Sequence, residues 1–270
     1  MVRLLSFSLP LIVAAVAAPK PVVLYEFDED SGSQIIDSSG VNPPANLDIP
    51  DQRALKRESG SLTLLRPVLL SSKSPPAKLI KAIKRSGEIT ISAWITPTNL
   101  SQSGPARIVT ISRNSSSRNV TLGQDKTKFD ARFRTEKTGA NGIPSLSSGK
   151  ALTKKTHVVF TRSKIGIGRI YINGRKNGQR SFPGSLKNWD TNYRIALGNE
   201  LSNNRPWLGT FHQVAIYSQA LSPTEIADQF QNGLALAKPK SSAERSRVLF
   251  TNHIEPCLLY TSDAADELCR

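Results

Sequence analysis

Acidic side chains gather in the stretch YEFDEDSGSQIIDSSG, residues 25–40, near the start of a chain that is otherwise basic. Glu26, Asp28 and Asp30 alternate there, and alternate residues of a β-strand point to one face. Two such carboxyl groups about 5 Å apart act on the glycosidic bond in a retaining glycoside hydrolase. Residues 30–32 read Asp-Ser-Gly, which is typical of a turn, so the alternative is a solvated acidic hairpin without a catalytic role.

The same stretch offers oxygen ligands for calcium. Asp28 and Asp37 are the candidate metal ligands. Calcium takes about six to eight oxygen atoms, and backbone carbonyls would supply the others. Structural calcium is therefore the one cofactor that the sequence suggests, and the hydrolase, the calcium site and the acidic hairpin stay open as alternatives.

Other catalytic patterns are absent from the sequence. There is no Gly-x-Ser-x-Gly nucleophile elbow. The glycines of GIGRIYING, residues 166–174, lie in a hairpin pattern without the helix that follows a dinucleotide-binding loop. The sequence therefore gives no second candidate for an active site.

Short segments that alternate between apolar and polar residues must position these side chains. EITISAWI, HVVFTR and FHQVAIYS are examples, and their lengths and their Gly, Pro, Asn and Ser boundaries are typical of strands. In RIYINGRKNGQ, residues 169–179, Asn173-Gly174 predicts a tight turn between antiparallel strands. The sequence therefore predicts an all-β sandwich or barrel.

Two short helices are expected among these strands. SPPAKLIKAIKRSG, residues 74–87, starts with an N-cap serine and a proline and places its apolar residues on one face. SPTEIADQFQNG, residues 222–233, repeats this start, adds a glutamate for a capping box and ends at a glycine. We expect both helices to pack against the strands.

An aromatic ring and several arginines fall on the polar faces of the predicted strands. The candidate ligand-binding residues, all turned outward by alternation, are Trp94, Arg132, Arg134, Arg169 and Tyr171. If their strands share a sheet, they form an aromatic platform edged by guanidinium groups, which suits an acidic or sulfated sugar. The alternative is that a loop covers Trp94.

Five segments occur in the order of a known family: YEFDEDSGSQIIDSSG, ITISAWITP, THVVFTRSKIGIGRIYINGRKNGQ, YRIALGNE and RPWLGTFHQVAIYSQALSPTEIADQF. They resemble the LamG-like jelly-roll domains of the concanavalin A-like lectin/glucanase superfamily over residues 21–233. The resemblance implies two antiparallel sheets in a jelly-roll sandwich and a role in binding sugars or proteins. Where many members read Gly-x-Ile-Asp-Glu, residues 209–213 read Gly-Thr-Phe-His-Gln, so two acids are replaced.

The first residues differ in character from this domain. Residues 1–17 have one basic side chain, an apolar run and a small-residue end, which predicts a secretory signal peptide cleaved after Ala17. The apolar run is too short to span a bilayer. We therefore expect a domain over residues 18–233 in a product that is secreted, periplasmic or at the cell surface, without a membrane span.

The last residues also differ from the domain. Residues 234–248 are basic and contain proline, which indicates a linker. Residues 249–256, LFTNHIEP, resemble the lead-in to a c-type cytochrome domain found beside LamG-like modules, so we expect the stub of a truncated downstream domain. Residues 257–270 hold both cysteines and read like the translation of a sequencing adapter; the alternative is a disulfide between Cys257 and Cys269.

The formal net charge of +15 predicts attraction to anionic partners. Basic residues are spread over nearly every segment, so no specific nucleic-acid partner is expected. The sequence predicts a non-catalytic exported binding or adhesion module for carbohydrate, acidic glycans included, or for an extracellular protein. The alternatives are a glucanase-type glycoside hydrolase and a structural spacer for a downstream c-type cytochrome domain.

Overall fold

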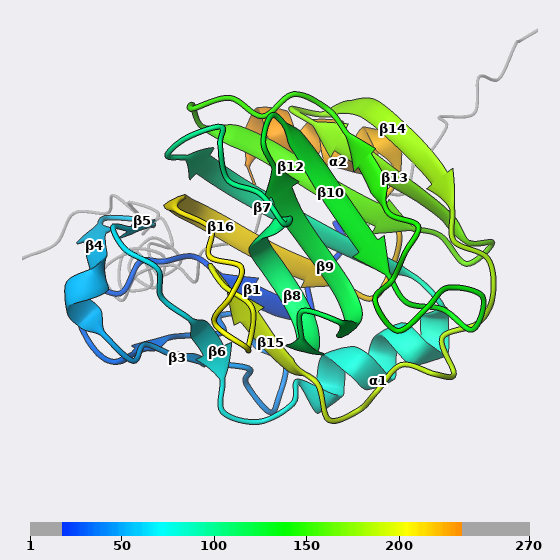
Figure 1. Ribbon diagram of the computed structural model, residues 1–270, viewed down its shortest axis with the longest axis horizontal. Coiled ribbons are helices and arrows are strands. Elements are labelled where there is room, and N and C mark those ends of the chain that lie inside the picture. The colour runs from blue at the N-terminus through cyan, green and yellow to red at the C-terminus, as the bar shows by residue number, and fades with distance from the viewer. Residues whose placement is uncertain (1–17, 234–270) are drawn as a thin grey trace, which may run out of the picture. The chain divides into compact units, whose positions relative to one another are not determined.

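The structure, a computed structural model, describes residues 18–233 and confirms the predicted all-β jelly-roll sandwich with two helices (Figure 1). The predicted signal peptide (1–17), linker (234–248), stub (249–256) and adapter-derived tail (257–270) lie outside the described residues. The elements in chain order are β1 (Val23–Tyr25), β2 (Gln34–Ile35), β3 (Leu47–Asp48), the 3-10 helix η1 (Gln52–Ala54), β4 (Leu55–Glu58), β5 (Ser61–Leu64), β6 (Leu70–Ser72), α1 (Ala77–Ser86), β7 (Ile89–Pro97), β8 (Ala106–Asn114), β9 (Ser117–Asp125), β10 (Lys128–Phe133), β11 (Leu146–Ser148), β12 (Thr156–Arg162), β13 (Ile167–Ile172), β14 (Arg175–Ser181), β15 (Arg194–Leu197), β16 (Gly209–Tyr217) and α2 (Pro223–Asn232).

Two eight-stranded antiparallel sheets form the sandwich. Sheet A has the strand order β14-β13-β12-β7-β16-β5-β4, and β1 also pairs with β16. Sheet B has the order β11-β10-β9-β8-β15-β6-β3-β2. In Figure 1, β8, β9 and β10 of sheet B lie in front of β7 and β16 of sheet A. Some neighbouring strands are consecutive in the chain, such as β8 and β9, and others are far apart in it, such as β7 and β16, so each sheet joins distant parts of the chain.

The apolar side chains between the sheets follow the alternation of the strands. The predicted inward face of β7 is fully buried in the core and consists of Ile89, Ile91, Ala93 and Ile95. From sheet B, Val120 and Leu122 of β9 join the same core. Burying one large apolar side chain stabilises the fold by about 1.5–3 kcal/mol. The core therefore holds the ends of the strands, and the loops that join them, in fixed positions.

The turn between β13 and β14 has the predicted conformation. Asn173 and Gly174 have φ values of 50° and 76°. Glycine adopts this left-handed region easily and asparagine tolerates it. The Asn173 side chain also accepts a hydrogen bond from the backbone N–H of His157 over 2.9 Å. The hairpin is therefore tied to β12 as well as closed by its own turn.

The two helices agree with the sequence in position but differ in how they begin. Helix α1 ends at Ser86, has Gly87 as its C-cap and buries Leu79, Ile80 and Ile83 as predicted. Its N-cap, however, is Pro76, and no side chain caps it, so the predicted Ser74 cap is wrong. None of the described helices is long and apolar enough to cross a membrane.

Helix α2 begins with the capping box that the sequence predicts. The hydroxyl of Ser222 accepts from the N–H of Glu225 over 3.2 Å, and the Glu225 carboxylate accepts from the N–H of Ser222 over 2.7 Å. These two bonds satisfy N–H groups that would otherwise lack partners at the helix start. The cap fixes where α2 begins, and so how it lies on the outer face of sheet A.

Replacing Ser222 by alanine is expected to lower the free energy of unfolding by about 0.5–2 kcal/mol, because the helix loses its side-chain cap. Thr224→Ala is the matched control, since Thr224 is exposed in the same turn and takes no part in the capping box. Urea unfolding of both variants measures the difference. An equal loss of stability in the two variants would contradict the assigned cap.

Candidate functional site

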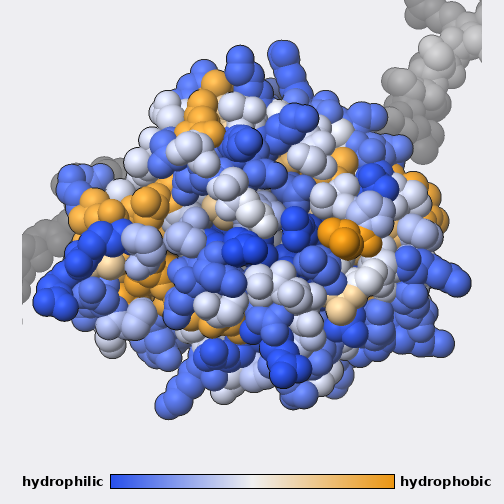
Figure 2. Space-filling model, in the orientation of Figure 1, coloured by the Kyte–Doolittle hydropathy of each residue, from blue (hydrophilic) through white to orange (hydrophobic). Residues whose placement is uncertain are grey.

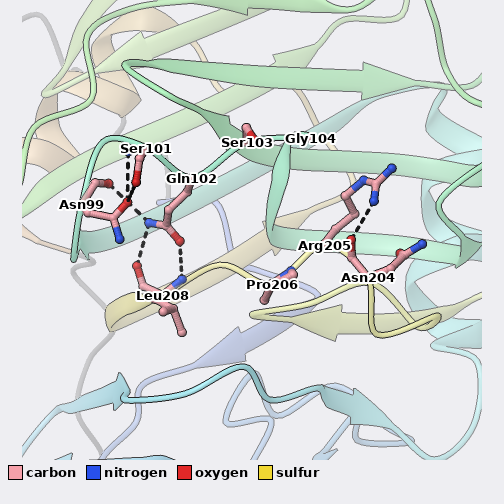
Figure 3. Close-up of a pocket in the computed structure, with 9 residues that line it drawn as sticks. All are labelled: Asn99, Ser101, Gln102, Ser103, Gly104, Asn204, Arg205, Pro206 and Leu208. Atoms are coloured by element: carbon pink, nitrogen blue, oxygen red, sulfur yellow. Dashed lines mark hydrogen bonds between the residues drawn. The ribbon is translucent and has the colours of Figure 1, made fainter.

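Two loops border an open hollow of about 540 Å³ where β7 ends and where β8 and β16 begin. One loop, residues 98–105, joins β7 to β8, and the other, residues 198–208, joins β15 to β16. We call this site the rim hollow. Figure 3 shows the residues that line it, which are Asn99, Ser101, Gln102, Ser103, Gly104, Asn204, Arg205, Pro206 and Leu208. Amide, hydroxyl and guanidinium groups dominate this lining, and no carboxyl side chain belongs to it.

Two glutamine side chains hold the rim hollow in shape. Gln102 donates to the carbonyl oxygen of Leu208 over 2.9 Å and accepts from the N–H of the same residue (Figure 3). Gln124 of β9 donates to the carbonyl of Asn99 and accepts from the indole N–H of Trp207, both over 2.9 Å. These bonds join the two loops to each other and to the sheet, so the hollow is formed before any ligand binds.

Arg205 lies against Gly104 at the wall of the hollow. Gly104 has a φ of 116°, and a Cβ placed there would come 2.7 Å from Cδ of Arg205, so the close packing requires glycine. The guanidinium donates to the carbonyl of Asn204 over 2.7 Å. Beside it, Ser103 and Asn204 are exposed. The wall therefore presents a positive charge, a hydroxyl and an amide to a polar ligand.

A buried ion pair fastens the second loop to the outer face of sheet B. Arg107 and Glu200 are fully buried, and Nε of Arg107 lies 2.8 Å from Oε2 of Glu200. The other carboxylate oxygen accepts from the hydroxyl of Ser112 and from the N–H of Leu201. Burial lowers the pKa of Arg107, and Glu200 acts in the opposite direction. The loop is thus held by a carboxylate whose two oxygens are both bonded.

The sequence did not reveal this ion pair. A β-bulge between Arg107 and Val109 shifts the alternation of β8, so the pattern does not predict where Arg107 points. Glu200 lies 93 residues further along the chain. No local spacing connects two residues so far apart.

Trp94 lies on the outer face of sheet A, as alternation predicts, but α2 covers part of it. Its ring stacks on His157, with centroids 4.6 Å apart, and on Phe230 of α2 at 5.7 Å. The ammonium of Lys155 lies 5.5 Å from the centroid of the Trp94 ring. A helix, and not the loop considered from the sequence, therefore covers this tryptophan, which stays half-buried.

The other candidate ligand-binding residues are divided between the two sheets, and only Arg169 and Tyr171 share sheet A with Trp94. Arg169 and Tyr171 lie on β13 of sheet A, but Tyr171 is only 2% exposed. Arg132 lies on β10 of sheet B, and Arg134 is the first residue after the end of this strand. Alternation predicts the face that a side chain takes but not the sheet that its strand joins, so the shared platform does not form.

The acidic stretch does not form the strand that a glucanase-type carboxylate pair requires. Strand β1 ends at Tyr25, and Phe27 has a φ of 57°, which breaks the alternation between Glu26 and Asp28. Strand β1 pairs with β16 and β2 pairs with β3, so β1 and β2 do not form a two-stranded hairpin. The acidic stretch instead forms a loop that closes where the N–H of Ser38 donates to the carbonyl of Leu24 over 2.9 Å. Glu26 accepts from the hydroxyl of Ser38 over 2.9 Å, and Asp28 is exposed.

Asp37 is the partner of a lysine in the structure. Its Oδ2 lies 2.5 Å from Nζ of Lys78 on α1, and the two side chains are 0% and 6% exposed. Backbone N–H groups of Leu24, Ser39 and Ala45 donate to the same carboxylate. The ammonium of Lys78 therefore supplies the positive charge that the sequence-based hypothesis assigned to calcium.

The histidines of the described residues stay neutral near pH 7. Burial lowers the pKa of His157 to about 3, and burial, followed by Lys155, lowers the pKa of His212 to about 4. Nε2 of His157 lies 2.8 Å from the hydroxyl of Ser92, but both residues are buried and Nδ1 has no partner in residues 18–233, so no catalytic triad forms. Within the same residues, no group of three or more His, Cys, Asp or Glu lies close enough to hold a metal ion.

Comparisons with known proteins agree on the fold. The profile of the concanavalin A-like lectin/glucanases superfamily matches residues 73–227. A Trypanosoma rangeli sialidase in complex with sialic acid is similar with a TM-score of 0.57 and 17% identity, over 80% of this chain and 33% of the sialidase chain. A structure of botulinum neurotoxin type C, whose cell entry depends on interaction with two ganglioside molecules, is also similar. Its TM-score is 0.58 at 13% identity, over 78% of this chain and 51% of the toxin chain.

These similarities are limited in two ways. The chain spans about a third of the length of the sialidase chain and about half that of the toxin chain. Identities of 17% and 13% show a shared fold and not a shared ligand. No curated protein sequence matches this chain.

Replacing Lys78 by alanine is expected to lower the free energy of unfolding by about 3–5 kcal/mol, because Asp37 would be left as a buried charge without its partner. Lys81→Ala, exposed on the same helix, should change it by less than about 0.5 kcal/mol. Urea unfolding followed by tryptophan fluorescence measures both. Similar losses in the two variants would show that the ion pair does not hold α1 to the N-terminal segment.

The carboxylate of Asp37 also makes the free energy of unfolding depend on pH in acid. Burial raises the pKa of Asp37, but the bonds from Lys78 and from backbone N–H groups outweigh burial and hold it below its ordinary value of 3.8. Such a carboxyl stabilises the fold above the unfolded pKa of about 3.9, and the stability is lost as pH falls through the folded pKa. Thermal unfolding should therefore show a steeper loss below about pH 4 in the wild type than in Asp37→Asn. Parallel curves for the two proteins would contradict this role.

Proposed function

Since the chain belongs to the concanavalin A-like lectin/glucanases superfamily, we propose that it is a non-catalytic, exported module that binds carbohydrate in the rim hollow. The shape and chemistry of the rim hollow carry the proposal. Its volume of about 540 Å³ lies within the range of roughly 300–1,000 Å³ that is usual for ligand sites. Its hydroxyl and amide groups both donate and accept hydrogen bonds, as the hydroxyl groups of a sugar require.

The charge of the rim hollow favours acidic glycans. Arg205 places a guanidinium at its wall, and none of the lining residues carries a carboxylate to oppose it. The net charge of +15 adds a general attraction for anions. Among the similar structures, the sialidase is in complex with sialic acid, an acidic sugar, and cell entry of the toxin depends on gangliosides. Both support glycans as the ligand class.

The positions of the acidic residues favour binding over hydrolysis. A glycoside hydrolase of the usual kind needs two carboxyl groups on either side of the bond that it cleaves. The rim hollow has none among its lining residues, and Glu26 and Asp28 lie beyond the end of β1 in a segment that joins the two sheets. The glucanase alternative therefore has no paired acids at the proposed carbohydrate site.

Export and the downstream domain depend on residues outside 18–233. The signal-like residues 1–17 support export to the periplasm, the cell surface or the medium. A role as a spacer before a c-type cytochrome domain rests on residues 249–256. A reading frame that continues without a Cys-x-x-Cys-His motif would remove the spacer role and leave carbohydrate binding in place.

A glycan array in low salt is expected to show binding to acidic glycans. Arg205→Gln should then weaken binding of the best acidic glycan at least about tenfold, which corresponds to about 1.4 kcal/mol, because charge-assisted hydrogen bonds are lost. Arg180→Gln is the matched control, since Arg180 is exposed on β14 and the variant has the same net charge. Calorimetric titration of both variants measures the difference.

Two results would overturn the proposed function. Absence of binding to both neutral and acidic glycans would leave only a protein-binding or architectural role. Hydrolysis of a β-glucan by the wild type, abolished in Glu26→Gln, would place the protein among the hydrolases of its superfamily.

A further inference from the structure

A second hollow, of about 460 Å³, lies on the outer face of sheet B. It is lined by Ser112, Arg113, Asp190, Asn192, Tyr193, Arg194 and Leu201. We propose that this sheet B hollow binds the anionic substituent, sulfate or carboxylate, of an acidic glycan. The inference rests on the proposed function and extends it from the rim hollow to the group that would distinguish acidic from neutral glycans.

The register of the strands places two arginines on either side of Ser112. Ser112 of β8 is paired with Arg118 of β9 on one side and with Arg194 of β15 on the other. Arg194 lines the hollow, whereas Arg118 is fully buried behind it and is not one of the lining residues. Arg113 follows Ser112 near the end of β8 and is exposed. Two guanidinium groups, those of Arg113 and Arg194, therefore belong to the lining of the hollow.

Little negative charge opposes these arginines. Asp190 carries the one carboxylate among the lining residues, and its Oδ1 accepts from the N–H of Asn192 over 2.9 Å. Glu200, which accepts from the hydroxyl of Ser112, is already paired with Arg107. Figure 2 shows that the face turned to the viewer, over β8, β9 and β10, is largely hydrophilic. The sheet B hollow is therefore a positively charged recess in a polar surface.

Two buried guanidinium nitrogens beside the hollow have no protein acceptor. Nε of Arg118 and Nε of Arg134 are buried and lack a hydrogen-bond partner among the described residues. Arg134 donates through Nη1 to the hydroxyl of Tyr193, a lining residue, over 3.4 Å. Leaving a buried N–H without an acceptor is unfavourable, and an anion in the hollow would offset part of this through its charge.

The accessible groups fit an oxyanion on a sugar. Arg194 has a single long bond, 3.4 Å from Nη1 to the carbonyl of Ser72, so its other N–H groups are available. A guanidinium binds two oxygens of sulfate or carboxylate at once. The exposed Asn192 amide lies in the same lining and suits the hydroxyl groups of a sugar ring. A free inorganic anion shares the oxyanion chemistry but not these sugar contacts.

Dextran sulfate and neutral dextran of equal size test the inference by calorimetric titration at about 150 mM salt, where long-range attraction is screened. The site variant is Arg113→Gln with Arg194→Gln. The matched control is Arg175→Gln with Lys176→Gln, which removes the same charge from exposed positions of β14. We expect dextran sulfate to bind the control like the wild type and to bind the site variant at least about tenfold more weakly. Thermal unfolding of both variants checks that the fold is retained.

Equal weakening in the two double variants would show diffuse attraction to a basic surface and would overturn the inference. So would the absence of dextran sulfate binding by the wild type. Neither result bears on the rim hollow, because Arg205→Gln and the glycan array decide the proposed function separately. Competition by sodium sulfate and by a monosaccharide sulfate, at equal sulfate concentration, distinguishes the sources because each carries one sulfate group, without the multivalency of the polymer. Equal competition shows that the hollow binds the anion itself, and stronger competition by the sugar sulfate shows that it also binds the sugar.

Discussion

The ion pair between Arg107 and Glu200 is the interaction on which the proposed binding face depends. Both side chains are fully buried on the outer face of sheet B, where each charge would be costly without the other. The pair holds the loop of residues 198–208 against the sheet. That loop supplies Arg205 to the rim hollow and Leu201 to the sheet B hollow. One buried contact therefore positions both candidate sites.

The two sheets differ in what covers their outer faces. Helix α2 closes part of sheet A, where Phe230 stacks on Trp94 and Gln229 donates to the hydroxyl of Tyr217 over 3.1 Å. Sheet B is closed by loops held through polar bonds, which leave hollows between them. A polar ligand finds hydrogen-bonding groups and positive charge at sheet B and the rim. A smaller hollow of about 310 Å³ beside Trp94 is also lined by Lys155 and His212.

Local patterns in the sequence predicted the local structure well. Alternation identified the buried face of β7, and the Ser-Pro-Thr-Glu segment identified the capping box of α2, because each depends on residues within one element. The candidate site depends on contacts between distant residues. Lys78 reaches Asp37 across 41 positions, and Glu200 reaches Arg107 across 93. Alternation also does not assign a strand to a sheet. A surface shared by Arg132 and Trp94 required their strands to lie in one sheet, and they lie in two.

A crystal structure of the protein with an acidic oligosaccharide selected from the glycan array tests the central claim most directly. The account predicts sugar density in the rim hollow, with hydroxyl groups bonded to Asn204 and Ser103 and with the guanidinium of Arg205 facing the ligand. Density on the outer face of sheet A beside Trp94, with an empty rim hollow, would contradict it.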